Sequence, residues 1–408
     1  MLVLLSQGSP QRLDQPLYTP TFFVGFVYNF LIVLHFSNNV IYSLYVTNEG
    51  GSATEVGLFM GLYAVAAVLG RPLVGYLIDK RGIKLVFILG SLTLALPNLG
   101  FAYALDSGLT PLVWLLRLIQ GFGFGAHFSA SFTFAGVIAP EGRRNESMAM
   151  YGLSGMVGAI IGPPLGEFLV TDHGLTWFLY FMAATGVLGF ISILFLHDDG
   201  PSRASDFSLR RLKTLLFSKE LRLTLFLAML LAVCFSTPNA FLAKLASERS
   251  VVGFGLYFSG LGVGGIVIRL IGGKWGDKFG LRRVLLPSFA AYGVALIVLY
   301  FSHATAWFIV AGVIAGVGHG LTFPAVTALG YTLAPRSLSG SIMAFVTGMM
   351  DVGAAITAFA LGIIAESFGY GIIFLLASSG SITAVAMLYY SMRVRPEQLH
   401  GPTAQDAS

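Results

Sequence analysis

Charged residues and cysteine are what this sequence has least of. Asp, Glu, Lys and Arg make up 11% of its 408 residues, whereas soluble domains carry about 25%. The one cysteine, Cys234, stands in an apolar run, which excludes a disulfide framework and a cysteine-based metal site. The sequence also has no Walker-type nucleotide motif, no HExxH pair and no CxxC pair. We therefore expect no cofactor, no bound metal and no enzymatic activity.

Long apolar stretches take the place of the missing charge. Hydrophobic residues make up 56% of the chain, and a helix needs about 20 apolar residues to cross a bilayer. The pattern predicts an all-α membrane protein, with twelve transmembrane helices in two pseudo-symmetric six-helix lobes. The apolar stretches cover residues 21–46, 56–77, 85–104, 111–138, 147–170, 175–196, 222–245, 252–273, 284–301, 304–333, 341–365 and 370–392.

The polar intervals divide the chain into five segments. We predict a cytoplasmic N-terminal lead-in over 1–20, an N-terminal lobe over 21–196, a cytoplasmic linker over 197–221, a C-terminal lobe over 222–392 and a cytoplasmic tail over 393–408. Within the linker, residues 208–216 combine leucines with basic residues, as expected of an amphipathic helix lying on the membrane surface.

Basic residues gather on one side of the predicted spans. The net charge of +5 would suit nucleic acid, but 19 of the 24 Lys and Arg residues fall in segments on the side of the N-terminus. Positively charged loops face the cytoplasm, so we expect both termini in the cytoplasm and no nucleic-acid partner. The chain is then a multi-pass protein of the inner membrane.

A charged loop motif occurs twice in the chain, 198 residues apart. The repeat indicates two parallel halves of six spans each. A carboxylate at a helix end can accept backbone hydrogen bonds and pair with basic residues, so each loop can latch the two lobes together. The residues are Arg71, Gly75, Asp79, Lys80, Gly82 and Lys84, which recur in register as Arg269, Gly273, Asp277, Lys278, Gly280 and Arg282.

The repeated loop resembles the motif between spans two and three of the major facilitator superfamily. Two further motifs extend the resemblance to its twelve-span drug:proton antiporter branch, over residues 20–392. In span four, Arg117 and Gln120 precede a glycine series beginning at Gly121. The resemblance implies a part for Arg117 in proton coupling, and an arginine within a span usually faces a cavity or a partner.

The third motif lies in span five and resembles the segment associated with antiporters. Small residues four apart allow close helix packing, and prolines bend the helix. The resemblance implies a hinge and seal of the central cavity, which favours export over uptake. The motif residues are Gly158, Gly162, Pro163, Pro164 and Gly166.

Asp351 is the most central acid in any predicted span. An ionisable residue within a span is a functional candidate, and a carboxylate there can bind and release a proton. We therefore take Asp351 as the first candidate for proton coupling, against a structural hydrogen-bonded aspartate. His319 in span ten is a further candidate, with a satisfied core histidine as the alternative.

Polar residues in spans one and four are candidates for the substrate cavity. Amide side chains within a membrane can bind a polar substrate or join helices. Span one contains no acid, although many drug:proton antiporters have one there, so that coupling mechanism is not expected here. The candidates are Asn29, His35, Asn38, Asn39 and Gln120.

These observations predict a secondary active transporter that works by alternating access. The favoured function is proton-coupled efflux of a small organic molecule, such as a drug, metabolite or metallophore-like compound. One alternative is a proton symporter that imports a sugar or organic acid. Another is a non-transporting membrane sensor. The expected partners are a small-molecule substrate, protons and the lipid bilayer, and we expect a monomer.

Overall fold

The computed structural model describes residues 16–48, 50–107, 110–138, 144–196, 217–273, 275–333 and 339–394. Within these ranges it is helical with short turns and contains no strand, as expected for a chain that satisfies its backbone hydrogen bonds inside a bilayer. The amphipathic stretch predicted at 208–216 and most of the predicted terminal segments lie outside the described residues.

The N-terminal half supplies six crossing segments. The first combines α1 (Pro20–Ser37), the 3-10 turn η1 (Asn38–Ile41) and α2 (Tyr42–Asn48). The others are single helices, namely α3 (Ala53–Arg81), α4 (Ile83–Ser107), α5 (Thr110–Val137), α6 (Arg144–His173) and α7 (Leu175–Leu194).

The C-terminal half repeats this arrangement. Its helices are α9 (Lys219–Glu248), α10 (Leu256–Gly272), the short α11 (Trp275–Phe279), α12 (Leu281–Phe301), α13 (Thr305–Thr332) and α14 (Ser339–Val394). Gly369, with φ 79°, interrupts α14, so α14 makes two crossings. Gly174, with φ 90°, makes the equivalent turn between α6 and α7. The two halves thus each cross six times, which confirms the predicted fold class.

Several helices extend past the predicted apolar stretches because their ends are polar and capped, whereas α7, α10 and α13 end within theirs. Ser52 and Glu55 form a reciprocal capping box at the start of α3, so the helix starts at Ala53 rather than near 56. Nine of the described helices are long and apolar enough to cross a membrane, and α10 is a shorter apolar helix.

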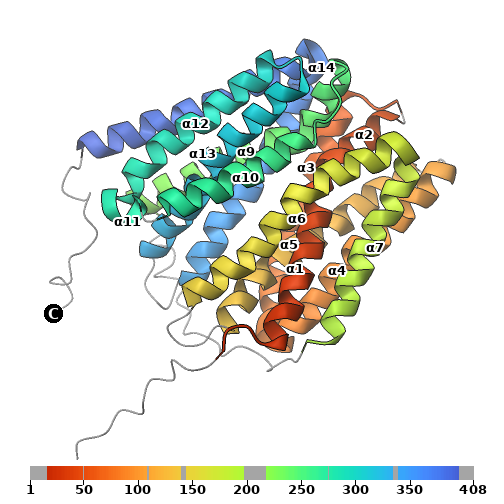
Figure 1. The fold of residues 1–408 in the computed structure, drawn as a ribbon, viewed down its shortest axis with the longest axis horizontal. Helices are drawn as coiled ribbons and strands as arrows, with labels where there is room; N and C mark the ends of the chain where they lie inside the picture. The colour runs from red at the N-terminus through yellow and green to blue at the C-terminus, as the bar shows by residue number, and fades with distance from the viewer. Residues whose placement is uncertain are drawn as a thin grey trace, which may run out of the picture.

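The two lobes lie side by side, the N-terminal lobe in red to yellow-green and the C-terminal lobe in green to blue (Figure 1). They meet where α3 packs on α14 and where α6 packs on α10. We call the end of the bundle that carries Lys80, Lys278 and Arg393 the basic end. The opposite end, with α2 and the turns at Gly174 and Gly369, is the far end.

Candidate functional site

An ion pair joins the two lobes near the middle of the bundle. Arg71 on α3 and Asp351 on α14 form this pair, with Arg71 Nε donating to Asp351 Oδ2 at 2.7 Å and Nη2 donating to the same oxygen. Arg71 Nη1 also donates to Thr347 Oγ1 at 3.0 Å. The side chains are only 12% and 14% exposed. Each charge therefore depends on the other lobe for its partner.

Aromatic rings connect this pair to the interior of the N-terminal lobe. The Arg71 guanidinium lies 5.9 Å from the centre of the Phe128 ring. Tyr63, two turns before Arg71 on α3, stacks on Phe124 with ring centres 5.5 Å apart. Phe124 in turn stacks on Phe36 at 4.3 Å. Tyr63 is buried and the three phenylalanines are half-buried, and together they provide an apolar wall beside the charged pair.

Arg117 is completely buried within the N-terminal lobe. Its guanidinium donates to Gln120 Oε1 at 2.6 Å, to Asn39 Oδ1 at 2.6 Å and to the Phe59 carbonyl at 3.2 Å. The rings of Tyr42, Phe59 and Tyr63 surround it, with centres between 4.4 and 4.9 Å away. Amide oxygens and ring faces thus stabilise this cation. Its predicted part in proton coupling stays a prediction.

The predicted cavity residues of span one mostly join helices of their own lobe. Asn29 Nδ2 donates to Ser154 Oγ at 2.8 Å and to the Tyr151 carbonyl at 3.2 Å, both on α6. His35 Nδ1 lies 3.1 Å from the Met182 carbonyl and from Thr185 Oγ1, both on α7. Of the remaining candidates, Asn38 donates to the Leu34 carbonyl of its own span at 2.9 Å, and Asn39 and Gln120 contact Arg117.

His319 belongs to a cluster in the C-terminal lobe. Its Nδ1 lies 3.1 Å from Tyr292 Oη on α12. Its ring stacks on Phe235 of α9 at 4.9 Å and lies 5.6 Å from Phe323. These partners differ from those of Asp351, so the structure places the two candidates in separate sets of contacts.

The span-five motif packs on both lobes. On one face, a Cβ built on Gly162 would lie 2.2 Å from Ser37 Oγ of α1, and one on Gly158 would lie 2.7 Å from the Phe30 carbonyl. On the other, a Cβ on Gly255 would lie within 2.8 Å of the backbone of Pro163 and Pro164. Gly166 packs against Asn38 in the same way as the first two glycines. The motif therefore lies at the seam between α6 and α10.

Two carboxylates bridge the lobes at the far end. Glu167 Oε1 accepts from the amides of Gly253 and Phe254 at 2.7 and 3.1 Å, and Oε2 accepts from Gly255 at 2.7 Å. Glu366 Oε2 accepts from the Thr54 amide at 2.8 Å. Each acid therefore binds backbone amides at the start of a helix in the other lobe, where the helix dipole favours negative charge.

The repeated loop motif lies at the basic end. Gly82 and Gly280 adopt the matching φ values of 86° and 89° that end one helix and start the next. Lys84 Nζ donates to the carbonyls of Leu194 and Leu196 at 3.3 and 2.7 Å, within its own lobe. The other motif positions are placed as follows: Lys80 and Gly273 are exposed, Gly75 and Arg282 are half-buried, and the side chains of Asp79 and Asp277 lie outside the described part.

Contact between the lobes is tight at the far end and loose toward the basic end. A Cβ on Gly57 of α3 would lie 2.4 Å from the Ala358 carbonyl of α14. Gly75 on α3, Gly152 on α6 and Gly348 on α14 lie nearer the basic end, and a Cβ there would meet nothing within 4 Å. The close glycine contacts between α3 and α14 therefore lie at the far end, and these three glycines toward the basic side face open space.

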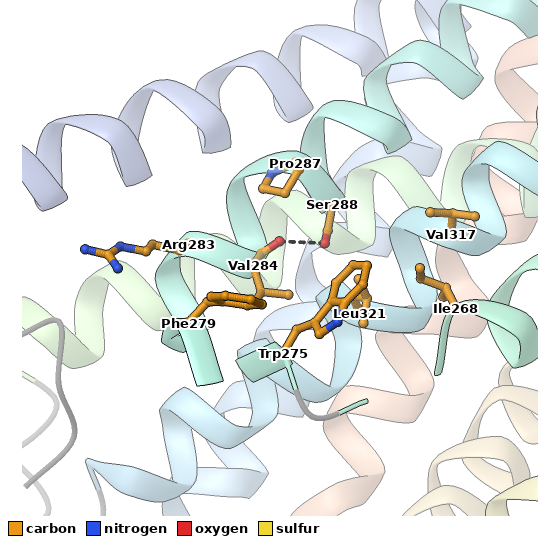
Figure 2. A pocket seen from close by; sticks show the side chains of 9 residues that line it. All are labelled: Ile268, Trp275, Phe279, Arg283, Val284, Pro287, Ser288, Val317 and Leu321. Atoms are coloured by element: carbon orange, nitrogen blue, oxygen red, sulfur yellow. Dashed lines mark hydrogen bonds between the residues drawn. The ribbon is translucent and has the colours of Figure 1, made fainter. Parts of the chain in front are cut away.

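A separate pocket of about 370 Å³ lies inside the C-terminal lobe, between α10, α11, α12 and α13. Figure 2 shows Trp275 across its centre, with the Arg283 side chain directed away from it. Its hydroxyl group, on Ser288, donates to the Val284 carbonyl of the same helix at 2.7 Å. The lining is otherwise mainly apolar and does not include Asp351 or Arg71, so this pocket is distinct from the inter-lobe site.

Two six-helix lobes joined by a charged pair and closed at one end define a two-lobed helical membrane transporter. Sequence comparison agrees, because the Major Facilitator Superfamily profile matches residues 21–268 and again 224–407. The chain belongs to the Major Facilitator Superfamily.

Named relatives and solved structures agree with this assignment. The multi-drug resistance efflux pump PmrA homolog of Lactococcus lactis is 25% identical, over 81% of this chain and 83% of its own. Multidrug resistance protein MdtG of Citrobacter koseri is 24% identical, over 91% and 93%. The nucleoside transporter NupG has the same fold, with a TM-score of 0.76, 14% identity and coverage of 91% and 99%. The expected resemblance to drug antiporters is thus confirmed.

Several residues at the lobe interface were not predicted as site residues. Arg71 was recognised as part of the repeat but not as the partner of Asp351. Glu167 was not among the predicted site residues, yet it accepts three backbone hydrogen bonds from the other lobe. The sequence signal that could have found these partners is charge. A lone acid within a span requires a cation, and the spans contain few cations.

Proposed function

We propose that this protein exports small organic molecules in exchange for protons, by alternating access of the two lobes. The observation that carries the proposal is the Arg71–Asp351 pair between α3 and α14. A proton-coupled transporter needs an ionisable group whose protonation changes the relation between its lobes. A carboxylate that binds the opposite lobe through its charge meets that need.

Protonation of Asp351 would remove the charge that holds Arg71. Leaving one partner of a buried ion pair unpaired costs about 3–5 kcal/mol. A bias of this size is large enough to change which arrangement of the lobes is populated, since about 5.5 kcal/mol moves an equilibrium from 1:99 to 99:1. Proton binding and lobe movement are then coupled through one pair of side chains.

We further propose that the protein lies in the inner membrane as a monomer, with both termini in the cytoplasm. The basic loops support this orientation. The space on the basic side then faces the cytoplasm, where an exporter takes up its cargo. The multidrug efflux relatives and the span-five motif at the α6–α10 seam favour export over import.

Proton movement in everted membrane vesicles tests the proposal. Candidate drugs, metallophores, sugars and amino acids are added to vesicles with an acidic interior, while a pH-sensitive dye reports proton release. An exported compound should dissipate the gradient in vesicles with the wild-type protein. Asp351→Asn should abolish this response, whereas Asp172→Asn, an exposed acid on α6, should retain it.

The alternatives give different results in the same vesicles. A proton symporter would move the compound and protons in the same direction, which would overturn the export proposal. A sensor would bind a compound saturably without counterflow of labelled substrate in proteoliposomes. Unchanged proton coupling in Asp351→Asn would remove Asp351 from the mechanism.

A further inference from the structure

Arg269 on α10 reaches into the opposite lobe as Arg71 does. The two arginines occupy the same place in the repeated motif. Arg71 contacts α14, and Arg269 contacts α6, the corresponding helix of the other lobe. Arg269 Nη1 lies 3.2 Å from Met156 Sδ, and Nε donates to the Gly320 carbonyl at 3.1 Å. The repeat therefore places one arginine on each side of the lobe interface.

The partners of the two arginines differ in chemistry. Met156, Val157 and Gly158 on α6 match Asp351, Val352 and Gly353 on α14 at a separation of 195 positions. The same separation relates Gly152 to Thr347, the second partner of Arg71. Arg71 contacts a carboxylate and a hydroxyl, whereas Arg269 contacts the thioether of Met156, and the position that matches Thr347 is Gly152.

Among the residues that the structure describes, none supplies a carboxylate to Arg269. Its guanidinium contacts the Gly320 carbonyl and Met156 Sδ, whereas Arg71 pairs with Asp351. Arg117 has no acid beside it either, but its amide and ring contacts enclose it completely. Arg269 has one neutral carbonyl and one weak sulfur acceptor. An incompletely partnered cation in a low-dielectric interior has a strong preference for an anion.

Open space lies beside Gly152 on α6, the helix that Arg269 contacts through Met156. Gly152 stands one helical turn from Met156 on the same face of α6, and a Cβ there would meet no atom within 4 Å. Arg269 itself is only half-buried. A ligand from the basic side can thus approach the Arg269 guanidinium past Gly152. At the matching position of the other lobe, Thr347 contacts Arg71.

We propose that Arg269 binds the anionic group of the transported molecule, and that the substrates are organic anions carrying a carboxylate, sulfonate or phosphate. The inference rests on the proposed transport function and adds the substrate class to it. An acceptor oxygen of the anion takes the position that a carboxylate takes at Arg71. The planar guanidinium fork suits two oxygens of one anion.

Two dyes with the same three-ring scaffold and opposite charge test the substrate class. Fluorescein is an anion and rhodamine 123 is a cation. We expect saturable fluorescein binding to the purified wild-type protein by fluorescence anisotropy, and weaker binding of rhodamine 123. Arg269→Gln should weaken fluorescein binding about 10- to 100-fold, the effect of losing a charge-assisted hydrogen bond.

A substitution at the opposing position separates charge from folding. Met156→Glu should pair with Arg269, as Asp351 pairs with Arg71, and weaken fluorescein binding by a similar factor while keeping or raising the melting temperature. Met156→Gln has the same size without the charge and should bind fluorescein as the wild type does. Equal fluorescein binding by Met156→Glu and Met156→Gln would overturn the proposal.

The remaining outcomes are also decisive. Absence of saturable fluorescein binding, or tighter binding of rhodamine 123, would overturn the anion class. Displacement of fluorescein by phosphatidylglycerol but not by soluble carboxylates would assign Arg269 to a lipid and overturn the substrate proposal. Binding is measured without a pH gradient, so its failure is distinguishable from loss of proton coupling in Asp351→Asn.

Discussion

Glu167 and Glu366 perform matching tasks at the far end of the bundle. Glu167 on α6 accepts hydrogen bonds from three amides between Gly253 and Gly255, and Glu366 on α14 accepts one from Thr54. Each carboxylate belongs to one lobe and binds the start of a helix in the other. The far end is thus held closed by acids and backbone amides, while the middle is held by the Arg71–Asp351 pair.

Neutralising Glu167 should loosen the far end. Glu167→Gln retains the side-chain volume but weakens bonds that depend on charge, at a cost of about 1–2 kcal/mol, which shifts an equilibrium about 5- to 30-fold. A reporter Ala358→Cys, buried at the closed end, should then react faster with a membrane-impermeant maleimide. Cys234 is buried and adds little background. Asp172→Asn is the matched control, and an unchanged rate in Glu167→Gln would contradict the prediction.

Adding a methyl group to the α3–α14 contact should also prevent closure. In Gly57→Ala, the new Cβ would lie 2.4 Å from the Ala358 carbonyl, a distance that forces the helices apart. We expect labelling at the Ala358→Cys reporter to increase at least as much as in Glu167→Gln. Gly75→Ala is the control on the same helix, because a Cβ there meets nothing within 4 Å. Equal labelling of the two alanine variants would refute this account.

The fold could be predicted because the length of an apolar stretch and the positive charge of a loop are local properties of the sequence. Each predicted stretch corresponds to a helical crossing, and some helices extend beyond it by a capped turn, as at Ser52 and Glu55. Gly369 lies between the predicted stretches 341–365 and 370–392, and the chain turns there, with φ 79°. Positions of helix ends depend on caps and turn glycines, which hydropathy does not report.

The site was predictable only in part. Asp351 was identified because an acid within a span is costly. Its partner was not, since Arg71 lies 280 positions away and the contact depends on how the lobes pack. The same holds for Glu167, whose partners just before α10 are 86 to 88 positions away. Sequence patterns indicate which groups need partners, and tertiary packing decides which partners they find.

A double-mutant cycle should show that Arg71 and Asp351 act as a unit. Arg71→Gln and Asp351→Asn should each lower the melting temperature of the purified protein, because each leaves a charge without its partner. The double variant should be less destabilised than the sum of the single variants, with a coupling of about 1–3 kcal/mol. The cycle is measured by thermal unfolding in detergent. Additive effects would indicate that the pair does not hold the lobes together.

Arg117 should be required for the stability of the N-terminal lobe. Arg117→Lys retains the charge but loses the fork that binds Asn39, Gln120 and the Phe59 carbonyl at once. We expect a loss of about 2–3 kcal/mol in stability, seen as a lower melting temperature, with fluorescein affinity unchanged in the protein that remains folded. Arg222→Lys, at an exposed position on α9, should change neither quantity. If Arg117→Lys instead kept its melting temperature and lost dye binding, Arg117 would face the substrate rather than support the lobe.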